Sequence, residues 1–390
     1  MGSGLTIRAI RLSTGDYYPV LLDSGLPFVL PNLWAYDLSQ TARFNTVKAY
    51  LGDVLQLHRW AEDSGTCLYR EFESLRPLPP RQLRSLAAYM TTRRDGRRAA
   101  QSSCDRKFAA ISSYFTYAYE HFAAKASLGL LEQRQAEKNK EATVARLSTL
   151  FKMLSQQSEL PVRASEISKE KICALDGLAR PASVNNPFVD QAVQVRNYCI
   201  LHVMLETAAR RAEVVLLEVD DVCLGPNPTL RIKRPTPFEQ AKRKDGASLK
   251  TQPRLLPISR HLAALLEGFL EDWRDSLLKP RRPTKALFPS SRDGRRLSVG
   301  AINSLLKKIN SCDTSGLVGR VHPHGIRTTS LNDLSRKDRD ESGRSSGAFR
   351  DSLTYFAGWS PGSEMPLRYL RESLTDSLNR LMRKSGGGGS

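Results

Sequence analysis

The stretch from Thr207 to Glu213 reads Thr-Ala-Ala-Arg-Arg-Ala-Glu and places an arginine and a glutamate three positions apart. It lies between two apolar segments, so Arg210 would present its guanidinium at the start of a helix. A helix N-terminus also attracts anions, which makes this corner a candidate phosphate seat. Glu213 is spaced to reach back and fix the approach of the arginine. The simpler alternative is a surface pair, Arg210 and Arg211, on an amphipathic helix.

Downstream of this corner lie further motifs that carry ammonium, imidazole, guanidinium, indole and phenol groups. They are Lys250-Thr251 before the run from Arg254 to Ile258, His324-Gly325-Ile326-Arg327, Ala357-Gly358-Trp359-Ser360, and Leu367-Arg368-Tyr369-Leu370. Exchange of a phosphodiester needs a nucleophile, cations that neutralise the phosphate, and groups that move protons. The set offers a residue type for each task.

These motifs and their order resemble the tyrosine recombinase family, the phage-integrase type of DNA strand-exchange enzyme, over the C-terminal half of the chain. The family pattern Thr-Gly-x-Arg-x-x-Glu appears with Ala208 in place of Gly. The pattern Pro-His-x-Leu-Arg appears with Ile326 in place of Leu, and Leu-Gly-His-Ser appears with Trp359 in place of His. The run from Leu287 to Ser290 resembles the family's Leu-Phe-Pro-Ser connection. Of the two arginines in the corner, only Arg210 matches the pattern.

The resemblance implies a role for each group. Two arginines would clamp the scissile phosphate, the lysine would protonate the leaving 5′-oxygen, and the histidine would help to deprotonate the tyrosine. The tyrosine would form a 3′-phosphotyrosyl link, and the indole N–H would donate to the phosphate. No cofactor, metal or nucleotide is implied. The implied catalytic residues are Arg210, Lys250, His324, Arg327, Trp359 and Tyr369, with Glu213 in support.

The nucleophile has a rival. Tyr369 follows Trp359 by one position more than is usual in the family, which implies a one-residue insertion between them. Tyr355 precedes the Gly-Trp turn and is the alternative. His322, two residues before His324, is interpreted as a neighbour with a structural role.

The charge balance points to a polyanion. The 390 residues include 59 Lys and Arg against 40 Asp and Glu, a formal net charge of +19, which favours nucleic acid as the partner. A basic membrane-surface protein is the other class, but no apolar run approaches the roughly 20 residues that a bilayer span needs. Two basic clusters are predicted to contact DNA phosphates rather than to be solvated loops. They are Arg93, Arg94, Arg97 and Arg98 around Gly96, and Lys242, Arg243 and Lys244 in the loop of Lys250, which could itself be one more phosphate contact.

The cysteines are scattered, and none of the six forms a CxxC pair. Neither a zinc site nor a disulfide framework is predicted, and the cysteines are expected to be reduced. No signal-peptide pattern opens the chain. We therefore expect a cytoplasmic protein, associated with a bacterial nucleoid or carried by a mobile element.

The periodicity predicts a mainly α fold with a small β-sheet. Residues 1–36 read as a β-hairpin segment after a linker-like start, either packed on the next domain or forming an arm-like extension. Residues 37–160 read as a helical core-binding domain with a linker, with a first helix that starts at Ser39 or Thr41. Residues 161–384 read as the catalytic α+β domain, and 385–390 as a Gly-rich linker. Predicted helices lie near 80–94, 105–122, 132–153, 198–205, 261–273 and 298–309; predicted strands lie near 221–224, 229–234 and 254–258; and 335–347 reads as an insertion.

The resemblance also implies an assembly. Its members close two domains around a duplex as a C-shaped clamp, and act as homotetramers on two double-stranded DNA sites through a Holliday junction, with room for accessory DNA-bending or directionality factors. The apolar stripe Leu370, Leu374, Leu378 and Leu381 would then dock on a neighbouring subunit, or else belong to its own core. A monomeric type IB topoisomerase and a DNA-binding protein without catalysis are the alternatives.

Overall fold

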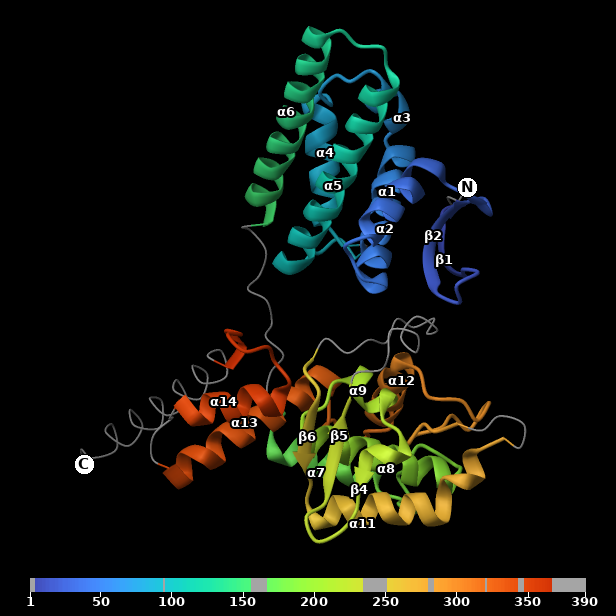
Figure 1. Cartoon of the computed structure of the whole chain (residues 1–390), viewed down its shortest axis with the longest axis vertical. Coiled ribbons are helices and arrows are strands. Elements are labelled where there is room, and N and C mark those ends of the chain that lie inside the picture. Colours follow the sequence, from blue (N-terminus) through green and yellow to red (C-terminus); the bar gives the residue numbers. More distant parts are fainter. Residues whose placement is uncertain are drawn as a thin grey trace, which may run out of the picture. The chain divides into compact units, whose positions relative to one another are not determined.

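The computed structural model describes residues 4–93, 95–155, 167–233, 251–279, 284–319, 321–342 and 347–366 (Figure 1). The chain divides into two compact units. One unit is built on Met1–Arg163, and the other begins at Ala164.

The first unit opens with the predicted β-hairpin, which is confirmed. Strands β1 (Thr6–Arg11) and β2 (Tyr17–Asp23) pair antiparallel, and the short β3 (Leu26–Pro27) pairs with β2. Gly15 takes a φ of 92° in the turn, a conformation that an L side chain resists. Leu21 is fully buried in the same apolar cluster as the helices that follow, so the hairpin packs on this unit.

The predicted start of the helical region was wrong. The first helix begins at Val29, inside the segment that we had assigned to the hairpin, and the next begins at Phe44 after Arg43. The N-cap position of this helix is Phe28, which offers no capping side chain, and Pro31 is tolerated because it lies in the first turn. The helices of this unit are α1 (Val29–Ser39), α2 (Phe44–Asp63), α3 (Leu68–Glu73), α4 (Pro80–Thr91), α5 (Gln101–Lys125) and α6 (Leu130–Ser155).

Aromatic rings fill the core of the first unit. The ring centroid of Phe72 lies 5.2 Å from that of Phe115, 5.6 Å from Tyr119 and 6.0 Å from Tyr114. Helices α2, α4 and α5 supply most of the buried apolar residues of this core, and α6 packs against α4 and α5 (Figure 1). The mainly helical prediction for this region is confirmed.

The second unit surrounds a small antiparallel sheet with helices. Its strands β4 (Val222–Cys223), β5 (Thr229–Ile232) and β6 (Arg254–Pro257) pair in that order, which confirms the three predicted strands. Its helical segments are α7 (Lys169–Ala179), α8 (Gln191–Thr207), α9 (Arg211–Leu216), η1 (Val219–Asp221), α11 (Arg260–Gly268), η2 (Phe269–Trp273), η3 (Asp275–Leu277), α12 (Val299–Ser311), α13 (Pro323–Ser342) and α14 (Gly347–Ala357).

Helix α8 runs through the middle of this unit. Its residues from Cys199 to Leu201, with Val203 and Met204, are almost fully buried, and α7, α11 and α13 contact it. The stretch 198–204 of this helix is apolar apart from His202, so this part of the helix lies in the core. Its C-terminal end places the Thr207 corner inside the packed interior, where Thr207, Ala208 and Ala209 are almost fully buried.

The first part of one predicted insertion is instead helical. We had read 335–347 as a loose Ser, Gly and charge-rich stretch, but α13 continues to Ser342. Residues 335–342 contain no glycine, which is compatible with a helix, and Arg336 pairs with Asp333 one turn earlier at 3.3 Å. Within the described ranges, no helix is both long and apolar enough to cross a bilayer.

Candidate functional site

The corner after α8 is a left-handed turn. Ala208 takes φ 50° and ψ 25° as the residue that ends the helix, a conformation usually left to glycine. Thr207 stabilises the last turn by donating its hydroxyl to the carbonyl of Val203 at 2.6 Å. Alanine there costs roughly 1 kcal/mol or more relative to glycine. Its methyl group lies in a buried cluster with Leu331 and Trp359, which offers partial compensation.

Glu213 reaches back to this corner as its spacing predicts. Its Oε2 accepts the backbone N–H of Arg210 at 2.7 Å, so the two residues cap the start of α9. The hydroxyl of Thr251 also donates to the carboxylate. Arg254 adds two parallel hydrogen bonds, one to each carboxylate oxygen and both at 3.0 Å. The side chains of Glu213 and Arg254 are both fully buried.

This environment keeps Glu213 ionised. Burial on its own would raise the pKa of the carboxyl group, but hydrogen bonds and charge from Arg254, with help from Thr251 and Arg327, lower the pKa below its ordinary value. A buried carboxylate is tolerated only when it is paired and hydrogen-bonded in this way. The corner is therefore built around a fixed negative charge.

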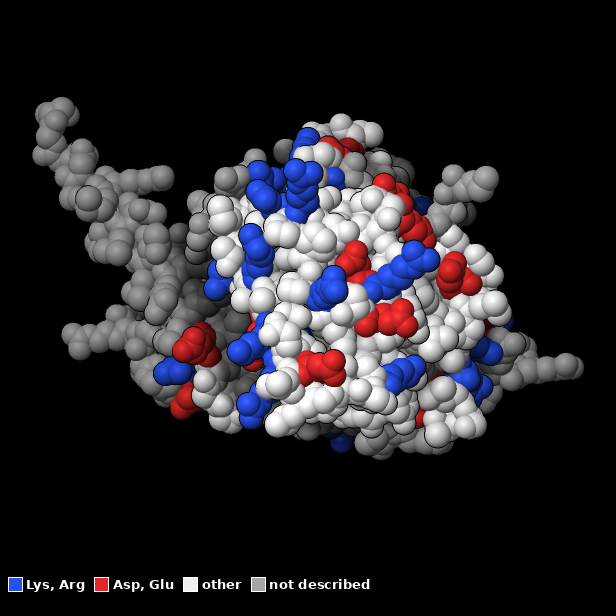
Figure 2. All heavy atoms as spheres, turned by 90° about the horizontal axis from the view of Figure 1, so that it is seen from above, with Lys and Arg blue, Asp and Glu red and all other residues white. Residues whose placement is uncertain are grey.

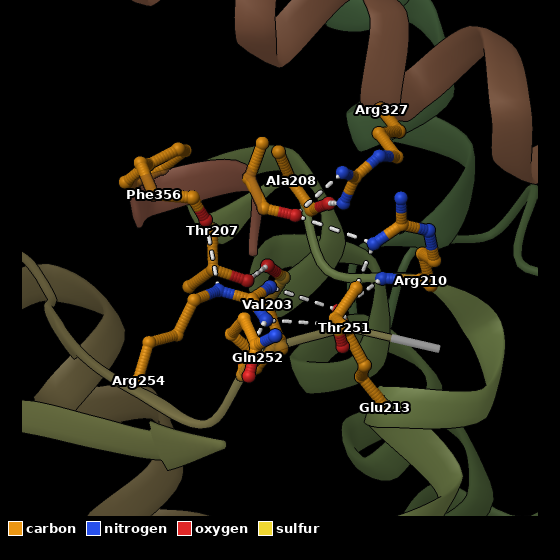
Figure 3. A network of polar contacts seen from close by, with 11 residues as sticks. Val203, Thr207, Ala208, Arg210, Glu213, Thr251, Gln252, Arg254, Arg327 and Phe356 are labelled. Atoms are coloured by element: carbon orange, nitrogen blue, oxygen red, sulfur yellow. Dashed lines mark hydrogen bonds and ion pairs between the residues drawn. The ribbon is translucent and has the colours of Figure 1, made fainter. Parts of the chain in front are cut away.

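The two arginines of the predicted clamp meet at one carbonyl. Arg210 Nη1 donates to Ala357 O at 3.2 Å, and Arg327 Nη2 donates to the same oxygen at 2.8 Å. Arg327 also donates to Ala208 O. Figure 3 shows the two guanidinium groups turned toward each other, one from the corner and one from α13. The side chain of Arg210 is 35% exposed, whereas Arg327 is 5% exposed.

The turn after α14 contributes Gly358 and Trp359 to the site. Gly358 takes φ 66°, and its carbonyl accepts the N–H of Gln252 at 3.1 Å. A Cβ atom at Gly358 would lie 2.4 Å from Arg254 and 2.9 Å from Thr251, so only glycine fits. Trp359 follows in the buried cluster, and the Cζ of Arg327 lies 5.9 Å from the centroid of its ring. The indole is thus both a packing residue and a neighbour of the arginine pair.

Helix α13 presents two of the predicted residues differently. His324 is exposed in the first turn, whereas Arg327, three residues later, is buried. His322 accepts the backbone N–H of Gly325 at its Nδ1, at 3.0 Å, and so caps the helix. The structural role that we expected for His322 is confirmed.

Several predicted site residues lie outside the described residues. They are Arg94, Lys242, Arg243, Lys244, Lys250 and Tyr369, together with the stripe Leu370, Leu374, Leu378 and Leu381. The rival Tyr355 is described: it lies on α14, it is 53% exposed, and its hydroxyl accepts the N–H of Leu255 at 2.9 Å.

Of the predicted phosphate contacts near Gly96, Arg93, Arg97 and Arg98 lie in an exposed turn. Arg93 and Arg97 are joined by a backbone hydrogen bond of 2.7 Å, and Gly96 takes φ 77°. Arg98 donates to the carbonyl of Leu154 at 2.9 Å, which ties the turn to α6. Figure 2 shows a face on which Lys and Arg are interspersed with Asp and Glu, so acidic groups break up the positive charge of that face.

Sequence reasoning missed Arg254 and Thr251 as parts of the site. One signal was available: in the alternating strand β6, Arg254 shares the inward side with Leu256, where a charged residue requires a buried partner. Within the described part of the chain, no group of three or more His, Cys, Asp and Glu side chains is arranged to hold a metal ion.

Residues 182–342 match the family model described as "Phage integrase family". The tyrosine recombinase XerD of two Mycobacterium tuberculosis strains is 28% identical over 138 residues, which is 35% of this chain. The match spans 39% of the length of XerD, well under two thirds.

Among solved structures, the Tn1549 transposon integrase in complex with transposon right end DNA has a TM-score of 0.55 at 15% identity, over 90% of this chain and 99% of that chain. The same integrase with circular intermediate DNA gives a TM-score of 0.54 at 16% identity, with the same coverage. The mainly helical fold with small sheets is therefore that of DNA integrases.

Proposed function

Because this chain belongs to the tyrosine recombinase (phage-integrase) family, we propose that it is a site-specific DNA recombinase. It would cleave and rejoin DNA through a 3′-phosphotyrosyl intermediate and a Holliday junction. The observation that carries this proposal is the convergence of the Arg210 and Arg327 guanidiniums on the carbonyl of Ala357.

Two converging guanidiniums suit a phosphodiester. Each is planar, always charged, and able to donate two parallel hydrogen bonds to phosphate oxygens. The partial exposure of Arg210 leaves room for a phosphate to approach, and the burial of Arg327 strengthens its field because the local dielectric is low. In the proposed reaction both neutralise the charge that develops on the non-bridging oxygens.

The remaining groups supply the nucleophile, transfer protons and donate a hydrogen bond to the phosphate. Tyr369 Oη forms the bond to phosphorus while the bond from phosphorus to the 5′-oxygen breaks. The phenol has an ordinary pKa of about 10, so His324 assists in removing its proton. Lys250 supplies a proton to the leaving 5′-oxygen, and the indole N–H of Trp359 donates to the phosphate. Attack by the 5′-hydroxyl of another strand then releases Tyr369, and the number of phosphoester bonds is unchanged, so no nucleotide is consumed.

We further propose that the protein acts as a homotetramer on two double-stranded recombination sites. Each subunit would close its two units around a duplex, with Arg93, Arg97 and Arg98 at backbone phosphates. The net charge of +19 supports this choice of partner. Accessory DNA-bending or directionality factors would act on this assembly.

Selection of bound sites from random duplex DNA, followed by a cleavage assay on the selected sequence, tests the proposal. We expect a covalent protein adduct at one defined phosphate in each strand and recombinant products from two copies of the site. Relaxation of supercoiled DNA by a monomer without site preference would indicate a topoisomerase. Tight binding with no adduct would indicate a DNA-binding protein of the same fold.

A further inference from the structure

Arg254 uses its guanidinium to join parts of the site that are far apart in the chain. Its Nη1 and Nη2 each lie 3.0 Å from one oxygen of Glu213, and its Nε donates to the carbonyl of Phe356 at 2.8 Å. The residue is 4% exposed, and its side chain is fully buried. Figure 3 shows it lying between the corner and the Phe356 backbone.

The two groups that Arg254 joins both lie next to the Arg210 and Arg327 pair. On one side, Glu213 accepts the backbone N–H of Arg210 at 2.7 Å. On the other side, Phe356 directly precedes Ala357, whose carbonyl accepts hydrogen bonds from both Arg210 and Arg327. Arg254 therefore fixes the corner and the shared carbonyl relative to each other.

Stabilisation of the fold is, by itself, a weak explanation for the buried ion pair of Arg254 and Glu213. Removing two charges from water is costly, and well-packed apolar residues often stabilise a core as well as a buried ion pair does. A bidentate fork, in contrast, fixes the distance and the plane of its partner. A lysine would keep the charge but lose this geometry, because an ammonium group is a point charge on a flexible stem.

We propose that Arg254 is a positioning residue for strand cleavage. Through Glu213 and the Phe356 carbonyl it sets the spacing of the Arg210 and Arg327 guanidiniums, without contacting DNA itself. The effect on cleavage rests on the proposed recombinase function, whereas the effect on the geometry of the corner does not.

The test compares Arg254→Lys with Arg196→Lys in the full-length chain. Arg196 is a matched control, because it is also buried in the second unit but donates to Pro289 O and Asn197 Oδ1, away from the clamp. Hydrogen exchange is measured at the amides of Arg210 and Trp359. Cleavage is measured in single turnover at saturating DNA, on a normal scissile phosphodiester and on a neutral methylphosphonate.

We expect Arg254→Lys to raise exchange at both amides at least tenfold, and Arg196→Lys to leave it unchanged. Cleavage of the phosphodiester should fall at least tenfold in Arg254→Lys while the DNA concentration at half-saturation stays within threefold. The loss should be smaller on the methylphosphonate, because a neutral centre depends less on the clamp. A purely stabilising residue would slow both substrates equally, and that result would overturn the proposal.

A second variant covers the case in which Arg254→Lys fails to fold. The double variant Arg254→Met with Glu213→Gln removes both buried charges and keeps an acceptor for the Arg210 amide. We expect it to melt cooperatively and still to cleave slowly. Wild-type exchange and wild-type cleavage in this variant would refute the positioning role. If wild-type protein cleaves no selected DNA, the recombinase proposal fails, and the exchange data alone still decide whether Arg254 sets the corner.

Discussion

Arg210 and Arg327 donate hydrogen bonds to the same backbone oxygen, that of Ala357, at 3.2 and 2.8 Å. Like charges brought this close repel unless something negative offsets them. Glu213 is the nearby anion, with its Oε1 3.8 Å from Arg210 Nη1. Arg254 pairs with the same carboxylate, so the three arginines leave this site with a net positive charge, and a phosphate would supply further negative charge.

Replacing Arg210 with alanine should slow formation of the covalent adduct about 100- to 1000-fold, the cost typical of losing one preorganised donor. DNA affinity should change little, because many other phosphate contacts remain. A gel assay of adduct formed over time on the selected site provides the measurement.

Arg211→Ala is the matched control, since the neighbouring arginine was the competing candidate in the sequence. We expect near-normal adduct formation from it. The opposite order of effects would mean that the wrong arginine was assigned.

Gly358→Ala should destabilise the second unit far more than Gly362→Ala. Both glycines have positive φ, 66° and 81°, so alanine is strained at either position. A Cβ at Gly358 also meets Arg254 and Thr251, whereas nothing lies within 4 Å of a Cβ at Gly362. We expect a difference of about 1 to 3 kcal/mol in the free energy of unfolding, the usual cost of overpacking. Denaturant melts of the two variants would measure it, and equal midpoints would rule out the steric argument.

Acid should destabilise the first unit through His58. Burial lowers the pKa of this histidine from 6.5 to about 4, and its ring lies 4.6 Å from that of Phe28. Between these values the unfolded chain binds the proton first, so the stabilisation is fully present above pH 6.5 and is lost as the pH falls toward 4. This difference between the two pKa values corresponds to roughly 3 kcal/mol in the free energy of unfolding.

Thermal melts from pH 4 to pH 7 should show this slope in the wild type and a flatter one in His58→Phe. His121→Gln, on α5, is the comparison: burial and the charge of Lys125 also lower the pKa of His121, but less than burial lowers that of His58, so this variant should flatten the slope less than His58→Phe. An unchanged slope in His58→Phe would remove His58 as the cause.

Strand cleavage should persist in EDTA and without nucleotide. The proposed mechanism draws its charge neutralisation from arginine and its proton transfers from histidine and lysine. Adduct yield on the selected site, with and without the chelator, is the measurement. Loss of cleavage on chelation, restored by magnesium, would contradict the mechanism.

The corner was predictable because the interactions that form it join residues close together in the sequence. Thr207, Arg210 and Glu213 lie within seven residues, so helix end, helix start and capping follow from spacing alone. The three strands and most of the helices were predictable for the same reason. The first helix was missed because Phe28, at its N-cap position, is not a capping residue type.

The partner of Glu213 was not predictable in the same way. Arg254 is 41 residues further along the chain, and several basic residues in that region compete for the same role. Only tertiary packing decides which of them is buried against the carboxylate. The convergence of Arg210 and Arg327 likewise depends on where the α14 turn places the Ala357 carbonyl.

The central claim is that Tyr369 is the nucleophile of a phosphotyrosyl recombinase, and comparison of Tyr369→Phe with Tyr355→Phe tests it most directly. Each variant lacks only one phenolic oxygen, so both should bind the selected site with wild-type affinity. We predict that Tyr369→Phe forms no covalent protein–DNA adduct, whereas Tyr355→Phe, which loses a hydrogen bond to the Leu255 N–H, still forms it. An adduct that survives in Tyr369→Phe and disappears in Tyr355→Phe would contradict the assignment, and one that survives in both would contradict the tyrosine mechanism itself.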